Sequence, residues 1–159
     1  MQVLWLTLLV FIIDQITKWT VYVNFDLYQS IPVIENFFYL TYVTNEGMAF
    51  GLTLPGGPII LLILSIIMTV ILVFLFWQER SSHILMRVSL ALILAGAIGN
   101  FTDRIILGKV IDFLHFKIST FWEWYIFNIA DSAVTIGMLL FIYYSIFIEN
   151  KSKLESQNN

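Results

Sequence analysis

Apolar residues are concentrated in long runs along the chain, and polar residues return between them. Each run approaches the ~20 residues with which a helix crosses ~30 Å of hydrocarbon. Lipid cannot satisfy backbone polar groups, so helices are the expected structure of such runs. The pattern predicts an all-α polytopic membrane protein, and we expect a frayed polar tail over residues 149–159. The predicted transmembrane helices cover about residues 3–23, 58–77, 84–103 and 126–148.

The segment between the first two runs has a different pattern. The stretch NFFYLTYVTNEGMAFGL, residues 36–52, is rich in aromatic and β-branched residues and breaks at the sequence NEG. Such a pattern is typical of short strands around a turn. We therefore expect two short strands that form a small sheet at the membrane surface. The whole chain, residues 1–159, is predicted to form a single membrane-embedded domain.

Composition supports a lipid environment and excludes several kinds of site. Apolar residues make up 59% of the 159-residue chain and charged residues only 12%, whereas soluble domains carry about 25% charged residues. A chain of this length cannot bury so much apolar surface in one core. It has no cysteine, which excludes a disulfide framework, a thiolate nucleophile and a cysteine-based zinc site. The net charge of −3 and the lack of a basic cluster argue against nucleic-acid binding.

The distribution of basic residues predicts how the chain is oriented. The segment 24–57 contains no lysine or arginine. The positive-inside rule therefore places this segment outside, and both termini in the cytoplasm. The basic residues that support this orientation are Arg80, Arg87, Lys151 and Lys153. Three cations after the third run, Arg104, Lys109 and Lys117, oppose the rule, and we interpret them as having a local role instead.

Two carboxylates are the strongest candidates for catalysis. Asp112 follows the third apolar run and Asp131 lies near the start of the fourth, so both are expected near the outer face. Two carboxylates at one low-dielectric site share a proton, and such a pair can activate water and protonate a leaving group. This is the chemistry of an aspartic peptidase, and it requires no cofactor. The alternative is that each carboxylate caps a helix or pairs with a loop cation.

Polar residues at helical spacing accompany both carboxylates. Asn100, Asp103 and Arg104 share one face if the third helix continues that far, and Asp103 then needs a dedicated partner because an acid opposes the dipole there. A structural end-cap network is the alternative. Asn128 and Asp131 repeat the spacing of three and suit a helix N-cap and first turn. That capping role does not exclude catalysis.

Two further pairs of residues qualify as site-organising groups. Asp14 and Lys18 are spaced as a helical ion pair, which neutralises itself in the membrane and orients the first helix. Their presence, with no basic segment before them, predicts a retained helix rather than a cleaved signal peptide. Asn45 and Gly47 belong to the sequence NEGMAFG. Glycine permits close backbone approach, so this segment is either a simple turn or a loop that grips a peptide through Asn45.

The sequence as a whole resembles a known family. The stretches DQITK, NEGMAFG, AGAIGNFTDRIILGKVIDFLHF and FNIADSAVTIG resemble, in the same order, the sequence motifs of lipoprotein signal peptidase, also called signal peptidase II. The resemblance implies an aspartic endopeptidase of the bacterial plasma membrane. It implies cleavage of the signal peptide from diacylglyceryl-modified prolipoproteins, just before the lipidated cysteine. Met48 departs from the small residue common at that position of the family motif.

The resemblance also implies roles for individual residues. It makes Asp112 and Asp131 the catalytic pair of the family. It further implies an outer β-cradle with a short outer-loop helix, and a cleft that binds the inhibitor globomycin. We expect a monomer surrounded by membrane lipid, since four helices with one pair need no partner. The residues that match the remaining polar positions of the family site are Asp14, Asn45, Asn100, Asp103, Arg104 and Asn128.

A non-enzymatic protein is the alternative interpretation. A small transporter subunit or a membrane assembly factor also carries intramembrane polar residues, which then line a path through the midplane. Here the second run contains only Ser65 and Thr69 as polar groups, and the charged residues gather towards one face. This distribution favours an active site near the membrane surface.

Overall fold

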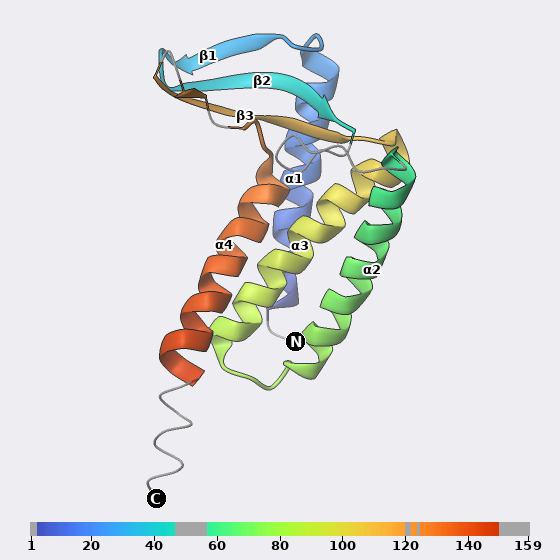
Figure 1. Ribbon diagram of the computed structural model, residues 1–159, viewed down its shortest axis with the longest axis vertical. Coiled ribbons are helices and arrows are strands. Elements are labelled where there is room, and N and C mark those ends of the chain that lie inside the picture. The colour runs from blue at the N-terminus through green and yellow to red at the C-terminus, as the bar shows by residue number, and fades with distance from the viewer. Residues whose placement is uncertain (1–2, 47–56, 120–121, 124, 150–159) are drawn as a thin grey trace, which may run out of the picture.

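Four long helices form a bundle, and a small sheet lies across one end of it (Figure 1). The computed structural model describes residues 3–46, 57–119, 122–123 and 125–149. The helices are α1 (Leu4–Asn24), α2 (Gly57–Gln78), α3 (Ile84–Leu107) and α4 (Ile129–Tyr143), which a π-helical turn, η1 (Tyr144–Glu149), extends. The strands are β1 (Ser30–Ile34), β2 (Phe38–Asn45), β3 (Val110–Ser119) and β4 (Trp122–Glu123).

The four helices, α4 together with η1, are long and apolar enough to cross a membrane, as the sequence pattern predicts. Large apolar side chains project outward along them, as Ile59, Val70 and Phe74 do from α2. In water such exposure would be costly, whereas in lipid it costs nothing. The bundle therefore has lipid as its solvent, and its polar groups are turned inward.

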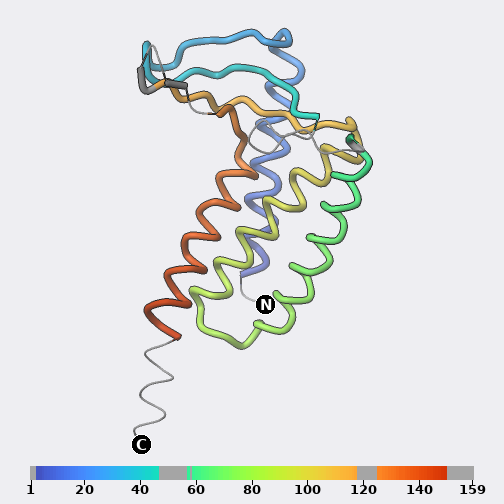
Figure 2. The backbone as a smooth tube through the Cα atoms, in the orientation of Figure 1, coloured from blue at the N-terminus to red at the C-terminus, as the bar shows by residue number. Residues whose placement is uncertain are grey.

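The helix α3 is the centre of the bundle and packs against α1, α2 and α4. Figure 2 shows the same arrangement as a tube, with α3 between α2 and α4. Close approach of α3 and α4 requires Gly96, because a Cβ atom there would lie 2.2 Å from the carbonyl oxygen of Ala130. Small residues at such crossings are typical of membrane helices.

The ends of two helices differ from those expected. The helix α3 continues to Leu107, where Gly108 adopts a left-handed conformation with φ of 73° and donates its N–H to the carbonyl of Arg104. Glycine accepts this conformation without steric cost, so it ends the helix. The helix α4 begins at Ile129 rather than near residue 126, because Asn128 caps it.

The sheet has more strands than expected. Its strands are antiparallel in the order β1-β2-β3-β4, so β2 pairs with both β1 and β3. In the stretch over residues 36–52, the described residues 36–46 contain β2. Its partners are β1, which precedes it, and β3, which follows α3. The expected turn at Gly47 and the residues after it lie outside the described residues.

The strand β3 was missed because it lacks the alternation of apolar and polar residues. Val110, Ile111, Asp112 and Phe113 are all buried, since this strand is covered on both faces. Tyr42, Ile111 and Phe113 form a core cluster with residues of the helices. The outer segments, as far as they are described, contain strands and turns without the expected short helix.

The two ends of the bundle differ in character. The start of α1, the connection between α2 and α3, and the end of η1 lie together at the end opposite the sheet (Figure 1). The polar residues that are predicted to form the site lie at the other end, which the sheet covers. Apart from Glu149, the predicted tail falls outside the described residues.

Candidate active site

Asp112 and Asp131 approach each other beneath the sheet, where β3 meets the first turn of α4. Asn128 contacts both of them. Its Nδ2 donates to Asp112 Oδ1 at 2.7 Å, and its backbone N–H donates to Asp131 Oδ2 at 3.3 Å. Asp112 is 3% exposed and Asn128 is completely buried. The two carboxylates therefore flank one buried amide.

The start of α4 explains why Asn128 has this orientation. Its side-chain oxygen accepts from the backbone N–H of Asp131 at 2.8 Å, and the Asp131 side chain accepts from the backbone N–H of Asn128. This reciprocal pair is a capping box, which satisfies donors that the first helical turn leaves free. The predicted capping role of Asn128 and Asp131 is thus confirmed. The same geometry leaves the Nδ2 of Asn128 directed at Asp112.

Burial and the neighbouring charge of Asp131 raise the pKa of Asp112 to about 7. Hydrogen bonds from Asn128 and Asn45, and the charge of Lys18, act in the opposite direction. Asn45 donates its Nδ2 to Asp112 Oδ2 at 3.3 Å. At neutral pH the site therefore carries one proton for part of the time, as expected for two carboxylates in a low-dielectric environment.

Asn100 and Arg104 approach the pair from α3. The Nδ2 of Asn100 donates to Asp131 Oδ1 at 2.7 Å. The guanidinium of Arg104 donates to the backbone carbonyl of Asn100 at 3.2 Å. Both side chains also line a groove between α2, α3 and α4. The other residues of the groove are Leu61, Leu64, Ser65, Met68, Gly96, Ala97 and Val134.

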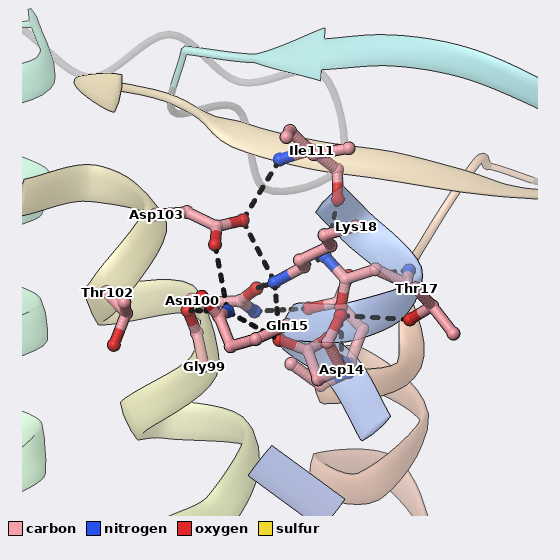
Figure 3. Close-up of polar contacts among 12 residues, drawn as sticks. Asp14, Gln15, Thr17, Lys18, Gly99, Asn100, Thr102, Asp103 and Ile111 are labelled. Atoms are coloured by element: carbon pink, nitrogen blue, oxygen red, sulfur yellow. Dashed lines mark hydrogen bonds and ion pairs between the residues drawn. The ribbon is translucent and has the colours of Figure 1, made fainter. Parts of the chain in front are cut away.

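A second buried cluster lies beside the carboxylate pair, between α1 and α3 (Figure 3). Lys18 forms ion pairs with Asp14 and Asp103, each at 2.9 Å. Asp103 thus has the dedicated partner that its position requires. Gln15, which was not among the predicted site residues, donates to both Asp14 and Asp103. Its position next to Asp14 was the only feature of the sequence that could have identified Gln15 as a site residue, because glutamine is common at exposed helix positions.

Asp14 connects this cluster to α4. Its Oδ1 accepts from the backbone N–H of Ala130 at 2.8 Å, in the first turn of that helix. Gly99 makes room for the carboxylate, because a Cβ atom there would lie 2.6 Å from Asp14 Oδ2. A charge near a helix N-terminus is stabilised when it is negative. Asp14 therefore holds α1, α3 and α4 together beside the carboxylate pair.

The structure brings nine of the ten predicted site residues into one connected set. Gly47 lies outside the described residues. His115 is buried in the sheet, where its Nδ1 forms a hydrogen bond with Thr41 Oγ1 at 3.0 Å. The nine are Asp14, Lys18, Asn45, Asn100, Asp103, Arg104, Asp112, Asn128 and Asp131.

Comparison with known proteins identifies the family. A family model described as "Signal peptidase (SPase) II" matches residues 6–147. The chain belongs to the signal peptidase II family. The lipoprotein signal peptidase of Desulforapulum autotrophicum is 41% identical over 139 residues, which cover 85% of each chain. That of Desulfitobacterium hafniense is 39% identical over 153 residues and covers 96% of this chain and 98% of its own.

Solved structures agree with this membership of the signal peptidase II family. A structure described as a bacterial membrane enzyme superposes with a TM-score of 0.81 at 36% identity, covering 92% of this chain and 88% of the other. A second such structure gives a TM-score of 0.79 at 34% identity. The chain is therefore a multi-pass membrane protease of the signal peptidase II family, and the transporter or assembly-factor alternative is not favoured.

Proposed function

We propose that this signal peptidase II is an intramembrane aspartic endopeptidase whose catalytic pair is Asp112 and Asp131. The observation that carries the proposal is the pair itself, in which the buried Asp112 and the half-buried Asp131 both accept hydrogen bonds from Asn128. The pKa of Asp112 near 7 supports a pair that holds one proton at working pH. Carboxylates within a membrane protein are functional candidates because their burial is costly.

In the proposed mechanism the two carboxylates have different roles. Asp131 accepts hydrogen bonds from Asn100 and from the backbone of Asn128, which stabilise its charged form. As the charged member, Asp131 takes a proton from a water molecule, and the resulting hydroxide attacks the scissile carbonyl carbon. Asp112 gives its proton to the carbonyl oxygen. Collapse of the tetrahedral intermediate then breaks the C–N bond, with a proton from the pair going to the leaving amine.

The proposed substrates are diacylglyceryl-modified prolipoproteins, cut just before the lipidated cysteine. The names of the relatives support this class, since they are lipoprotein signal peptidases. The groove that ends at Asn100 and Arg104 is apolar along Leu64, Met68 and Val134, which suits the apolar helix of a signal peptide. Asn45 and Arg104 are proposed to hold the peptide backbone. A globomycin-type inhibitor is proposed to compete for the same groove.

The experiment that tests this function is a cleavage assay with the detergent-purified protein. A prolipoprotein carrying the diacylglyceryl group is expected to be shortened at the peptide bond before its modified cysteine. Because Asp112 must carry the proton, the rate should fall as pH rises through about 7. Failure to cleave the lipidated substrate at any pH below about 7, where Asp112 holds its proton, would reject the proposal.

The proposed orientation places both termini in the cytoplasm and the catalytic pair near the outer face of a bacterial plasma membrane. The basic residues Arg80 and Arg87 support it, as does the absence of lysine and arginine from the segment 24–57. The whole chain is proposed to be one domain that acts as a monomer. A reporter protein that is active only in the cytoplasm should be active when it is inserted after Gln78 and inactive when it is inserted near Glu35. Activity near Glu35 and inactivity after Gln78 would reject this orientation.

A further inference from the structure

The ammonium group of Lys18 has an uncharged partner besides its two carboxylates. Besides the ion pairs with Asp14 and Asp103, Lys18 Nζ donates to Asn100 Oδ1 at 3.0 Å. Lys18 is 2% exposed. An ammonium has three hydrogen atoms and no acceptor, so each hydrogen has a partner. The third partner, Asn100, is the residue that donates to Asp131.

The orientation of the Asn100 amide follows from its neighbours. Lys18 can only donate, so the atom of Asn100 that faces it must be the oxygen. Asn128 Nδ2 also faces this oxygen, at 3.1 Å. Its identity as nitrogen is fixed in turn, because the other end of the Asn128 amide accepts from the backbone N–H of Asp131. The Nδ2 of Asn100 is thereby turned towards Asp131 Oδ1, at 2.7 Å.

Of these two donors, Lys18 constrains the Asn100 side chain more strongly. The Nδ2 of Asn128 carries two hydrogen atoms, but three acceptors surround it. Asp112 Oδ1 lies nearest, at 2.7 Å, and the carbonyl of Ile111 lies at 3.2 Å. The bond from Asn128 to Asn100 is therefore shared, whereas the bond from Lys18 has a hydrogen of its own.

We propose that Lys18 is a positioning residue for catalysis, which fixes the Asn100 amide so that it donates to Asp131. The inference rests on the proposed assignment of Asp112 and Asp131 as the catalytic pair. A reversed amide would place its oxygen against the Asp131 carboxylate. Two partial negative charges would then face each other, and Asp131 would accept a proton more readily.

Other charged groups near Asp131 do not orient this amide. Arg104 lies within electrostatic range of Asp131, Asp112 and Asp103, but among the described residues it bonds the backbone carbonyl of Asn100 rather than its side chain. Asp14 reaches α4 through the backbone of Ala130. These groups act on the pair through their charge, whereas Lys18 acts through its charge and also sets the direction of one hydrogen bond.

The test uses a charge-balanced double variant, Asp14→Asn with Lys18→Met. It has the formal charge of the parent, and an asparagine at position 14 can still accept from Ala130. We expect the acid limb of the kcat/KM profile to move to higher pH by about one unit, the size expected for losing one hydrogen bond to a charged group. The loss of activity at low pH should appear as a lower kcat more than as a higher KM. Asp14→Asn alone, which keeps Lys18, should not move the limb upward.

A second double variant separates the donor from its charge. Asp14→Asn with Lys18→Gln has the same formal charge as the methionine variant but keeps N–H groups that can face Asn100. Its acid limb should stay near that of the parent. The comparison of the glutamine variant with the parent still tests the inference if the methionine variant does not fold. An upward shift with glutamine would overturn the inference, because a donor without a charge would then be insufficient.

The Asn100→Ala background tests whether Lys18 acts through Asn100. In that background, adding Asp14→Asn and Lys18→Met should move the acid limb no further, since substitutions of coupled residues are non-additive. A parental acid limb in the Asp14→Asn, Lys18→Met variant would overturn the inference, as would a full shift in the Asn100→Ala background. Full activity of Asp112→Asn or Asp131→Asn would instead show that the catalytic assignment itself is wrong.

Discussion

Replacing Asp112 or Asp131 by asparagine should abolish cleavage and leave the protein folded in the membrane. Each carboxylate performs one half of the proton transfer, so removal of either stops the reaction. General acid–base catalysis contributes about 10²- to 10⁴-fold, and groups that act as a unit lose nearly all of it together. The rate of each variant should therefore fall by at least about 10²-fold. Initial rates on a lipidated prolipoprotein provide the measurement.

The matched control is Asp26→Asn. Asp26 is an exposed residue in the connection between α1 and β1, and it is not one of the predicted site residues. Its rate should equal that of the parent. Asparagine at position 112 removes a carboxyl group whose burial raises its pKa, so no buried charge is left unpaired. Loss of activity in Asp112→Asn with an unchanged melting temperature would then be a chemical effect, whereas a melting temperature that falls with activity would point to misfolding.

Replacement of Asn128 should have the second-largest effect, because this residue both caps α4 and bonds the proposed catalytic pair. Asn128→Ala loses the cap, at a cost of about 1 kcal/mol of stability, together with the hydrogen bond to Asp112. Asn128→Ser keeps a cap oxygen but loses the amide donors. Both variants should lose activity by more than about 10-fold, the effect of one hydrogen bond to a charged group.

Stability should separate these two variants where activity does not. Thermal unfolding in detergent should show Asn128→Ser close to the parent and Asn128→Ala below it. If the serine variant regains the parent's activity along with its stability, Asn128 serves α4 alone and has no part in the chemistry. An equal loss of stability in both variants would mean that capping is not what Asn128 contributes to folding.

The sequence predicted the helices well, because a run of apolar residues that matches the thickness of a bilayer has few alternatives. Helix ends depend on single residues. Gly108 ends α3 and Asn128 caps α4, so two helix ends differ from the expected positions. The sheet was predicted only in part. The strand β3 is buried on both faces, so its residues show none of the alternation that reveals a half-buried strand.

That Asp112 and Asp131 lie together with most of their polar neighbours could be predicted from helical spacing and from the resemblance to a family. The links between helices could not. Lys18 was expected to neutralise Asp14 alone, since spacing within one helix reveals only local pairs. Its contacts with Asp103 and Asn100 depend on how α1 packs against α3. Gln15 was missed for the same reason, because its partners on α3 come from the fold rather than from the sequence nearby.

The most direct test of the account is the initial rate of purified Asp112→Asn relative to the parent on one lipidated prolipoprotein. Both proteins are compared at the pH of highest parental activity and at equal folded concentration. We expect a rate below about 1% of the parent, since Asp112 alone supplies the proton to the scissile carbonyl oxygen in the proposed mechanism. A folded Asp112→Asn variant that keeps more than about 10% of parental turnover would contradict the assignment of Asp112 and Asp131 as the catalytic pair.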